Sequence, residues 1–149
     1  MNAIERAELL KQAILFSALN EEELAKLAQL AGKRSFSAGE TIFWEGDPSD
    51  WFYIVVEGKV KIAKYASSGK ELIVTIFTRG HTFGEVAVFD GRPYPASAQA
   101  WDEATVLGIR RDDLPAFLEQ NPAVALKIIN VLGGRLRDAH DRLRDMAGE

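Results

Sequence analysis

Residues 82–98 carry the clearest signal for ligand-binding chemistry in the sequence. The pair Phe83-Gly84 ends a strand-like stretch, and a glycine lets a ligand approach the main chain closely. Residues 85–88 then leave room for a turn or two of helix, whose unpaired main-chain amides would attract an anion. The carboxylate of Glu85 beside those amides could accept hydrogen bonds from a sugar hydroxyl. The segment therefore suits a ligand such as a sugar phosphate.

The rest of the sequence gives little support for catalysis or metal binding. The chain has no cysteine and two histidines, His81 and His140, which excludes disulfides, thiolate zinc sites and iron–sulfur clusters. Acidic clusters such as Asp112-Asp113 stand at helix starts, where capping and the helix dipole account for them. No catalytic triad motif and no Walker-type or dinucleotide-binding glycine loop is present. We therefore predict a protein that is not an enzyme and has no metal site, with haem ligation by one histidine as an open alternative.

Composition and charge narrow the class of protein further. The 149 residues, 47% of them hydrophobic, suffice for one core, and 12 glycines against 5 prolines indicate an ordered chain with many turns. The net charge of −4 offers no general attraction to nucleic acid. No apolar run is long enough to span a membrane, and residues 1–11 lack the features of a secretory signal. We expect a cytoplasmic protein that has no membrane partner.

Short strands are the elements that must position residues 82–98. Strand-like apolar runs interrupted by turn residues predict seven or eight strands, at spacings typical of a sandwich or roll. Residues 51–56 and 60–65 are predicted to form a hairpin around Gly58. Residues 96–101 are likewise predicted to pair with residues 105–109.

Helices are predicted on both sides of the strands. Asn20 and Glu23 show the capping-box pattern that opens a helix, and Gly32 can close it. The predicted division of the chain is N-terminal helices at 1–32, strands at 33–110 and C-terminal helices at 111–149.

The last of these helices carries a seam of apolar residues. Asn121-Pro122 supplies a cap and a proline at the first helical position, and the helix could run to Met146. It would be roughly 37 Å long, more than so small a domain easily covers, so the seam favours pairing with a second copy over packing on the strands. The pair Gly133-Gly134 indicates either close approach of another group or a point where the helix yields. The predicted dimer interface, with spacings of three and four, comprises Ile129, Leu132, Leu136, Ala139, Leu143 and Met146.

Residues 82–98 resemble the phosphate-binding cassette of cyclic-nucleotide-binding domains, in which Phe-Gly-Glu, apolar residues and a loop lead into a strand. The glycine-marked stretches 45–47 and 52–60 resemble the β-roll core of that family. Residues 134–146 resemble the dimerisation helix of CRP/FNR-type bacterial transcription regulators. The resemblance covers nearly the whole chain. It implies a mainly β fold: a double-stranded, jelly-roll-like β-roll with short N-terminal helices and a long C-terminal dimerisation helix.

Two places depart from the family pattern. Tyr94 stands where the family has an arginine that pairs with the cyclic phosphate, and Pro95 after it has no amide proton to donate. Ala139 and His140 stand where some cyclic-AMP-responsive members have hydroxyl side chains. Arg92 could take the anion if its loop were shifted, although a solvated loop arginine is the simpler interpretation. The ligand-binding residues that we predict are Phe83, Gly84, Glu85, Val86, Ala87, Arg92, Tyr94, Ala96, Ser97, Ala139 and His140.

The resemblance implies the effector-binding and dimerisation domain of a CRP/FNR-like transcription regulator. A small-molecule effector, either a cyclic nucleotide or another small anion, would bind in the β-roll and act through the C-terminal helix of a homodimer. The helix-turn-helix domain that binds DNA in such regulators would follow the long helix and is absent from this chain, which ends at Glu149. The alternative is a pocket that binds no nucleotide, in a protein that serves as a dimerisation or protein-interaction scaffold.

Overall fold

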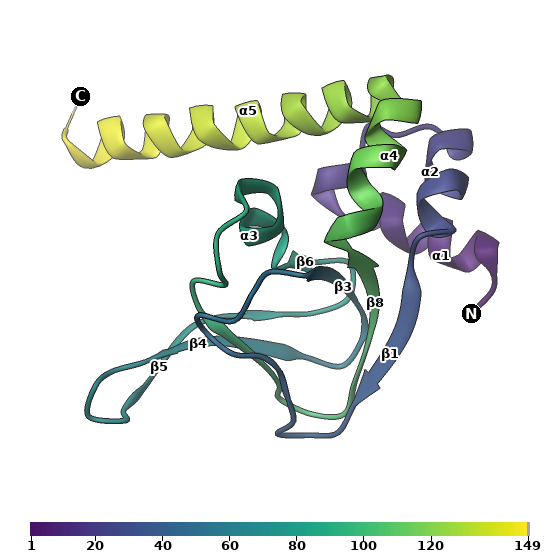
Figure 1. The fold of residues 1–149 in the computed structure, drawn as a ribbon. Helices are drawn as coiled ribbons and strands as arrows, with labels where there is room; N and C mark the ends of the chain where they lie inside the picture. The colour runs from purple at the N-terminus through teal and green to yellow at the C-terminus, as the bar shows by residue number, and fades with distance from the viewer. Residues whose placement is uncertain (149) are drawn as a thin grey trace.

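Two antiparallel four-stranded sheets face each other and form a β-roll (Figure 1). In residues 1–148, which the computed structural model describes, eight strands make up the two sheets. One sheet has the order β1-β8-β3-β6 and the other the order β2-β7-β4-β5. The mainly β fold predicted from the sequence is confirmed. The strands are β1 (Gly32–Phe36), β2 (Thr41–Phe43), β3 (Trp51–Glu57), β4 (Val60–Tyr65), β5 (Glu71–Phe77), β6 (Thr82–Phe83), β7 (Ser97–Ala100) and β8 (Ala104–Arg110).

Both predicted hairpins are wrong, because the strands concerned lie in opposite sheets. Strand β3 bonds to β6 and β8 and not to β4, while β7 bonds to β2 and β4 and not to β8. Short turns usually join neighbouring antiparallel strands. Here the turn at Gly58 carries the chain across the roll from one sheet to the other. Among consecutive strands of the described chain, β4 and β5 alone pair as a hairpin.

The two turns that cross the roll are bound to each other. The main-chain amide of Lys59 donates to Oδ1 of Asp102 at 2.7 Å, and the amide of Trp101 donates to the carbonyl of Lys59 at 2.9 Å. Gly58 has a φ of +81°, and a Cβ at this position would lie 2.3 Å from the carbonyl oxygen of Glu103. Gly58 is therefore required both by its conformation and by the contact between the turns.

Strand β3 separates two hydrophobic clusters and is buried on both faces, which explains its unbroken apolar run. Phe52 and Ile54 face the helices, whereas Tyr53 and Val55 face the space between the sheets. The helical core, on the helix side, includes Leu9, Leu10, Leu15, Phe16, Leu24, Leu27, Phe52, Ile54, Leu107, Ile109, Val124 and Ile128. The roll core, between the sheets, includes Phe36, Phe43, Tyr53, Val55, Val60, Phe83, Tyr94, Ala98 and Val106.

Helices precede and follow the strands, and their caps agree only in part with the predictions. Helix α2 begins with the predicted capping box, in which Asn20 and Glu23 exchange hydrogen bonds of 2.9 Å. Gly32 does not close this helix; it opens β1, because a turn at residues 29–31 already ends α2. The helices are α1 (Ala3–Gln12), α2 (Glu21–Ala28), α3 (Glu85–Asp90), α4 (Leu114–Gln120) and α5 (Pro122–Met146), with short 3₁₀ turns η1 (Ile14–Phe16) and η2 (Arg111–Asp113).

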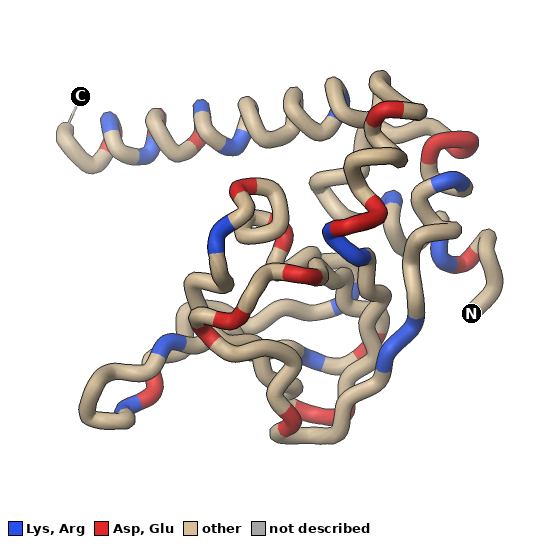
Figure 2. Tube along the Cα trace, viewed as in Figure 1, with Lys and Arg blue, Asp and Glu red and all other residues tan. Residues whose placement is uncertain are grey.

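Helix α5 has two different halves. Its first half packs on the helical core through Val124 and Ile128, and Lys127 forms an ion pair with Glu23 of α2. Its second half passes over α3 and leads away from α1, α2 and α4 (Figure 1). Basic and acidic residues are interspersed along this second half (Figure 2).

The helix is continuous through Gly133-Gly134, and in the single chain a Cβ at either glycine would meet no atom within 4 Å. Asn121 stands at the N-cap position of α5, as predicted, but its side chain donates to the carbonyl of Phe117 and does not accept from the helix. No helix in the described part of the chain has the length and apolar character needed to cross a membrane.

Candidate functional site

An apolar cleft of about 180 Å³ opens at the mouth of the β-roll, beside β6 and α3. Seven predicted ligand-binding residues line it: Phe83, Gly84, Glu85, Val86, Ala87, Tyr94 and Ala96. The rest of the wall was not among the predicted ligand-binding residues and comprises Phe43, Ile62, Phe77, Thr82 and Pro95. Three of those residues come from distant strands, and neither spacing nor composition marks them as neighbours of Gly84. Only Thr82 and Pro95 lie within the segment that the sequence singled out.

Gly84 joins β6 to α3 and shapes the floor of the cleft. Its φ of +82° is a conformation that residues with a Cβ rarely adopt. A Cβ there would also lie 3.3 Å from the ring of Tyr94 and 3.4 Å from the ring of Phe43. The glycine therefore leaves room for two aromatic rings in addition to any ligand.

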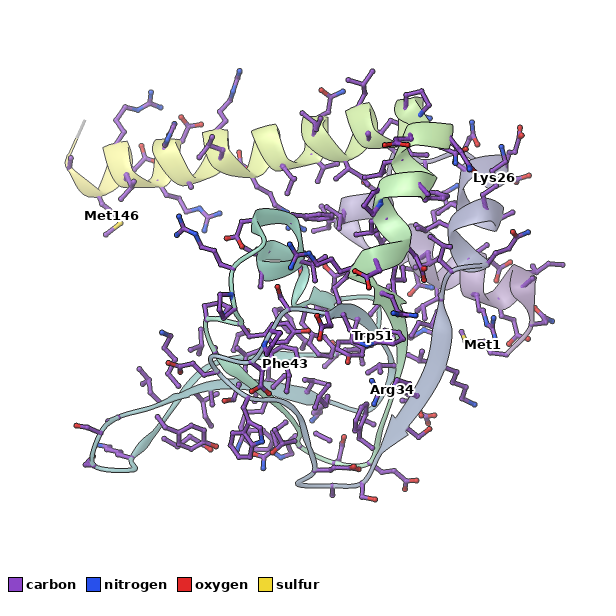
Figure 3. All side chains as sticks on the ribbon, viewed as in Figure 1. Met1, Lys26, Arg34, Phe43, Trp51 and Met146 are labelled. Carbon is purple, nitrogen blue, oxygen red and sulfur yellow. The ribbon has the colours of Figure 1, made fainter. Side chains whose placement is uncertain are left out.

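Tyr94 points into the roll and is 4% exposed. Its ring stacks on Phe43, with centroids 3.6 Å apart and planes within 7°. Its hydroxyl donates to the carbonyl of Trp51 and accepts from the amide of Trp51 at 3.3 Å. Burial raises the pKa of Tyr94 to about 12, so the phenol is neutral at physiological pH. Phe43 and Trp51, labelled in Figure 3, thus hold a neutral ring in the interior of the roll.

Glu85 is buried, although it carries a charge. It is 8% exposed, and its Oε1 lies 3.7 Å from a guanidinium nitrogen of Arg135 on α5. No group in residues 1–148 donates a hydrogen bond to the Glu85 carboxylate within 3.5 Å, so this ion pair is its one described polar contact. The pair connects the helix beside the cleft to the long C-terminal helix.

A second cavity, of about 560 Å³, lies on the other side of Glu85. It is bounded by α1 and η1, the turn between β5 and β6, and α5. His81, a predicted loop residue, is in this wall, and its Nδ1 accepts from the amide of Thr78 at 3.3 Å. The lining residues shared with the cleft are Phe77, Thr82 and Glu85.

Four predicted ligand-binding residues lie outside the cleft. Arg92 is on an exposed loop, where its amide donates to Asp90 at 2.9 Å. The hydroxyl of Ser97 is buried and accepts from the amide of Glu45 at 2.8 Å. Ala139 and His140 are exposed on the second half of α5. A single chain therefore does not bring these residues to the cleft.

The predicted interface residues on α5 differ in exposure. Leu132 is partly buried against the helical core, and Ala139 is exposed. Leu126, which the predicted seam omitted, is 63% exposed. The remaining predicted residues are exposed apolar side chains: Ile129 (59%), Leu136 (59%), Leu143 (63%) and Met146 (82%).

A β-roll with a glycine-marked short helix at its mouth and a long helix behind it is the architecture of a cyclic-nucleotide-binding domain. The family model for the cyclic nucleotide-binding domain matches residues 33–121. The chain belongs to this family, and the matching domain is that of CRP-like transcription regulators.

Curated relatives agree with this assignment. A "CRP-like cAMP-activated global transcriptional regulator" of Mycobacterium tuberculosis is 33% identical over 139 residues, which are 93% of this chain and 62% of the relative. The "Cyclic AMP receptor protein" of Thermus thermophilus is 31% identical over 130 residues, or 87% of this chain and 60% of the relative. The chain thus spans about three fifths of the length of these relatives.

Solved structures give the same assignment. The N-terminal domain of a transcriptional regulator from Streptomyces coelicolor A3(2) is similar with a TM-score of 0.84 and 32% identity, over 91% of this chain and 94% of that chain. The sensor domain of the transcriptional regulator DNR from Pseudomonas aeruginosa is similar with a TM-score of 0.78 and 27% identity, over 93% of both chains.

Proposed function

We propose that this chain is the effector-binding and dimerisation part of a transcription regulator, and that it performs no catalysis itself. The observation that carries the proposal is the ion pair between Glu85 and Arg135, which joins the cleft to α5. A ligand in the cleft would contact the residues that begin α3, including Glu85. Its binding would favour one arrangement of α3 against α5 over another. Arg135 would transmit this change in the position of α3 from the β-roll to α5.

The partner in this proposal is a second copy of the chain, and the second half of α5 is the contact. Leu136, Leu143 and Met146 are exposed apolar side chains on the part of the helix that leads away from the other helices. Burying such a seam against an identical helix removes apolar surface from water. Gly133 and Gly134, where an added Cβ would meet no atom within 4 Å in the single chain, would let the second helix approach closely.

DNA contact is assigned in this proposal to a region outside residues 1–149. The CRP-like transcriptional regulator and the cyclic AMP receptor protein among the relatives are both longer than the part that this chain matches. The net charge of −4 also gives the chain no general attraction to the phosphate backbone.

Sedimentation equilibrium tests the dimer. Leu136→Glu should convert a dimer to a monomer, because it places a charge in the apolar seam. Arg137→Glu is the matched control, since the next residue points about 100° away around the helix. A monomeric wild-type chain, or equal weakening by both substitutions, contradicts the proposed interface.

A dimerisation scaffold without an effector is the second candidate, and the position of Tyr94 favours it. The family resemblance leads us to expect a cyclic nucleotide as ligand. However, the position of the family's phosphate-pairing arginine holds Tyr94, whose neutral ring is stacked and hydrogen-bonded in the interior of the roll. Isothermal calorimetry with cyclic AMP, cyclic GMP and a cyclic dinucleotide tests that expectation directly. A scaffold predicts an intact dimer with neither heat nor a thermal shift from any small molecule, whereas a sensor predicts binding of at least one class.

A further inference from the structure

We propose that the cleft beside Gly84 binds a small, mainly apolar ring compound that carries one hydrogen-bond donor and no negative charge. This inference rests on the proposed sensor function and names the class of its effector. Three properties of the cleft carry it: the charge of its wall, its size and a carboxylate at its edge that accepts no hydrogen bond from residues 1–148.

The wall of the cleft opposes an anion. Among the described residues that line it, none is a lysine, arginine or histidine, and Glu85 carries the one formal charge. Arg135 approaches Glu85 from the side of the second cavity and does not line the cleft. The Tyr94 hydroxyl already exchanges hydrogen bonds with the main chain of Trp51. A negatively charged ligand would therefore face a carboxylate in an apolar surrounding, where repulsion is poorly screened.

The size and lining of the cleft select a single ring. Its volume of about 180 Å³ is well below the roughly 300–1,000 Å³ of sites that take drug-sized molecules. A dry cavity of about 150 Å³ with an apolar lining, by comparison, accepts benzene. Phe43, Phe77, Phe83 and Tyr94 supply aromatic faces and edges around this space. A flat ring can pack against them in an offset or edge-on arrangement.

The carboxylate of Glu85 explains why the ligand needs a donor. The residue is 8% exposed, and its ion pair with Arg135 spans 3.7 Å, longer than a hydrogen bond. A carboxylate with little solvent contact is stabilised by each hydrogen bond that it accepts. An N–H or O–H on the ligand would supply one at the end of the cleft where α3 begins.

Three probes of similar size separate these properties: benzyl alcohol, benzylamine and benzoate. Each is titrated into the ¹⁵N-labelled wild-type chain, and the amide shifts of Gly84 and Ala87 report the cleft. The amide of Ala25, which lines the separate groove between α1 and α2, reports binding elsewhere. Benzyl alcohol and benzylamine should bind at least about ten-fold more tightly than benzoate, a difference that one favourable or unfavourable charge contact can supply.

Glu85→Gln tests the origin of this preference. It retains the size of the side chain and an acceptor oxygen but removes the charge, so benzylamine and benzoate should become nearly equal. Glu119→Gln is the matched control, because it removes a carboxylate from an exposed position on α4, outside the cleft, and should leave the order of the three probes unchanged.

Two results overturn the inference in distinguishable ways. If benzoate or cyclic AMP binds as tightly as benzyl alcohol, the cleft is an anion site, and the sensor function stands without this ligand class. If no probe and no cyclic nucleotide shifts Gly84 or Ala87 in the wild-type dimer, the ligand class and the sensor function both fail, and the scaffold remains.

Discussion

The helical core and the roll core meet at β3 but are built differently. The helical core is mainly aliphatic and closed by α1, α2, α4 and α5, and its leucines at 9, 10, 15 and 27 are at most 1% exposed. The roll core is rich in aromatic rings and opens at one end into the cleft. A closed aliphatic core is suited to holding the fold rigidly. A cavity that is lined by aromatic rings and open to solvent is suited to binding and releasing a ligand. We therefore assign stability chiefly to the first, and the ligand binding of the proposed function concerns the second.

The most damaging change should be one that breaks the roll at its crossing turns. Gly58→Ala adds a Cβ at a φ of +81° and 2.3 Å from the carbonyl of Glu103, so the two turns must separate. We expect a loss of more than about 3 kcal/mol in the free energy of unfolding, measured in urea. Gly69→Ala is the control, since Gly69 also has a positive φ but its Cβ would meet no atom within 4 Å. It should cost about 1–2 kcal/mol. Equal losses would show that the contact between the turns is unimportant.

Replacing a large side chain by alanine should lower the free energy of unfolding more in the helical core than in the roll core. Leu27, 1% exposed, lies in the closed helical core, and Leu27→Ala should destabilise the protein by about 3 kcal/mol. Phe77, at the wall of the cleft, is only partly buried, and Phe77→Ala should cost about 1–2 kcal/mol because solvent already reaches its neighbours. Chemical denaturation of both variants measures the contrast, and a larger loss at Phe77 would reverse the assignment of stability to the helical core.

Alkaline pH should weaken the roll core selectively. Burial raises the pKa of Tyr94 from its ordinary 10.0 to about 12, so the unfolded chain loses this proton first. The contribution of Tyr94 is complete below pH 10 and is lost as the pH rises towards 12. The difference in unfolding free energy between the wild type and Tyr94→Phe should therefore shrink over this range. A constant difference would mean that the Tyr94 hydroxyl is not buried as described.

Acidic pH should instead weaken the contact between α2 and α5, and this loss of stability should be the smallest of the four predicted effects. The pKa of Glu23 is lowered, first by its hydrogen bond with Lys127 and then by that with the Asn20 amide. Its contribution is present above the ordinary pKa and is lost as the pH falls through the lowered value. Glu23→Gln should cost about 1 kcal/mol at neutral pH and less at an acidic pH below the lowered pKa, where Glu23 is protonated. Thermal melts at both pH values check this, and the same loss at both would contradict it.

Local patterns predicted the parts of the fold that local forces determine. The capping box at Asn20 and Glu23, the start of α5 at Pro122 and the strand-like period of β3 follow from contacts within a few residues. The pairing of strands does not, because a short turn at Gly58 can either make a hairpin or cross between sheets. The crossing is decided by the burial of β3 on both faces, which involves helices distant in sequence.

The same limit applies to the cleft. Gly84 and Glu85 were identified because a glycine that allows close approach to the main chain and a carboxylate that can accept hydrogen bonds are adjacent in one segment. Phe43 and Ile62 were not, because they reach the cleft only through the pairing of β2 and β4 with β7. Tyr94 was identified as a departure from the family pattern, but its hydrogen bonds to Trp51 depend on a strand more than forty residues away in sequence.

The contact between Tyr94 and Trp51 also gives the cleft an optical reporter. Trp51 is the one tryptophan of the three that is not exposed, since Trp44 and Trp101 are 53% and 50% exposed. An aqueous quencher such as acrylamide would suppress the emission of those two first and leave that of Trp51. Because the guanidinium groups of Arg34 and Arg110 lie 5.7 and 5.9 Å from its ring, the emission wavelength of Trp51 is sensitive to small shifts of its surroundings, which include Tyr94 of the cleft wall. Filling of the cleft could then be followed by fluorescence in the natural sequence, without any label.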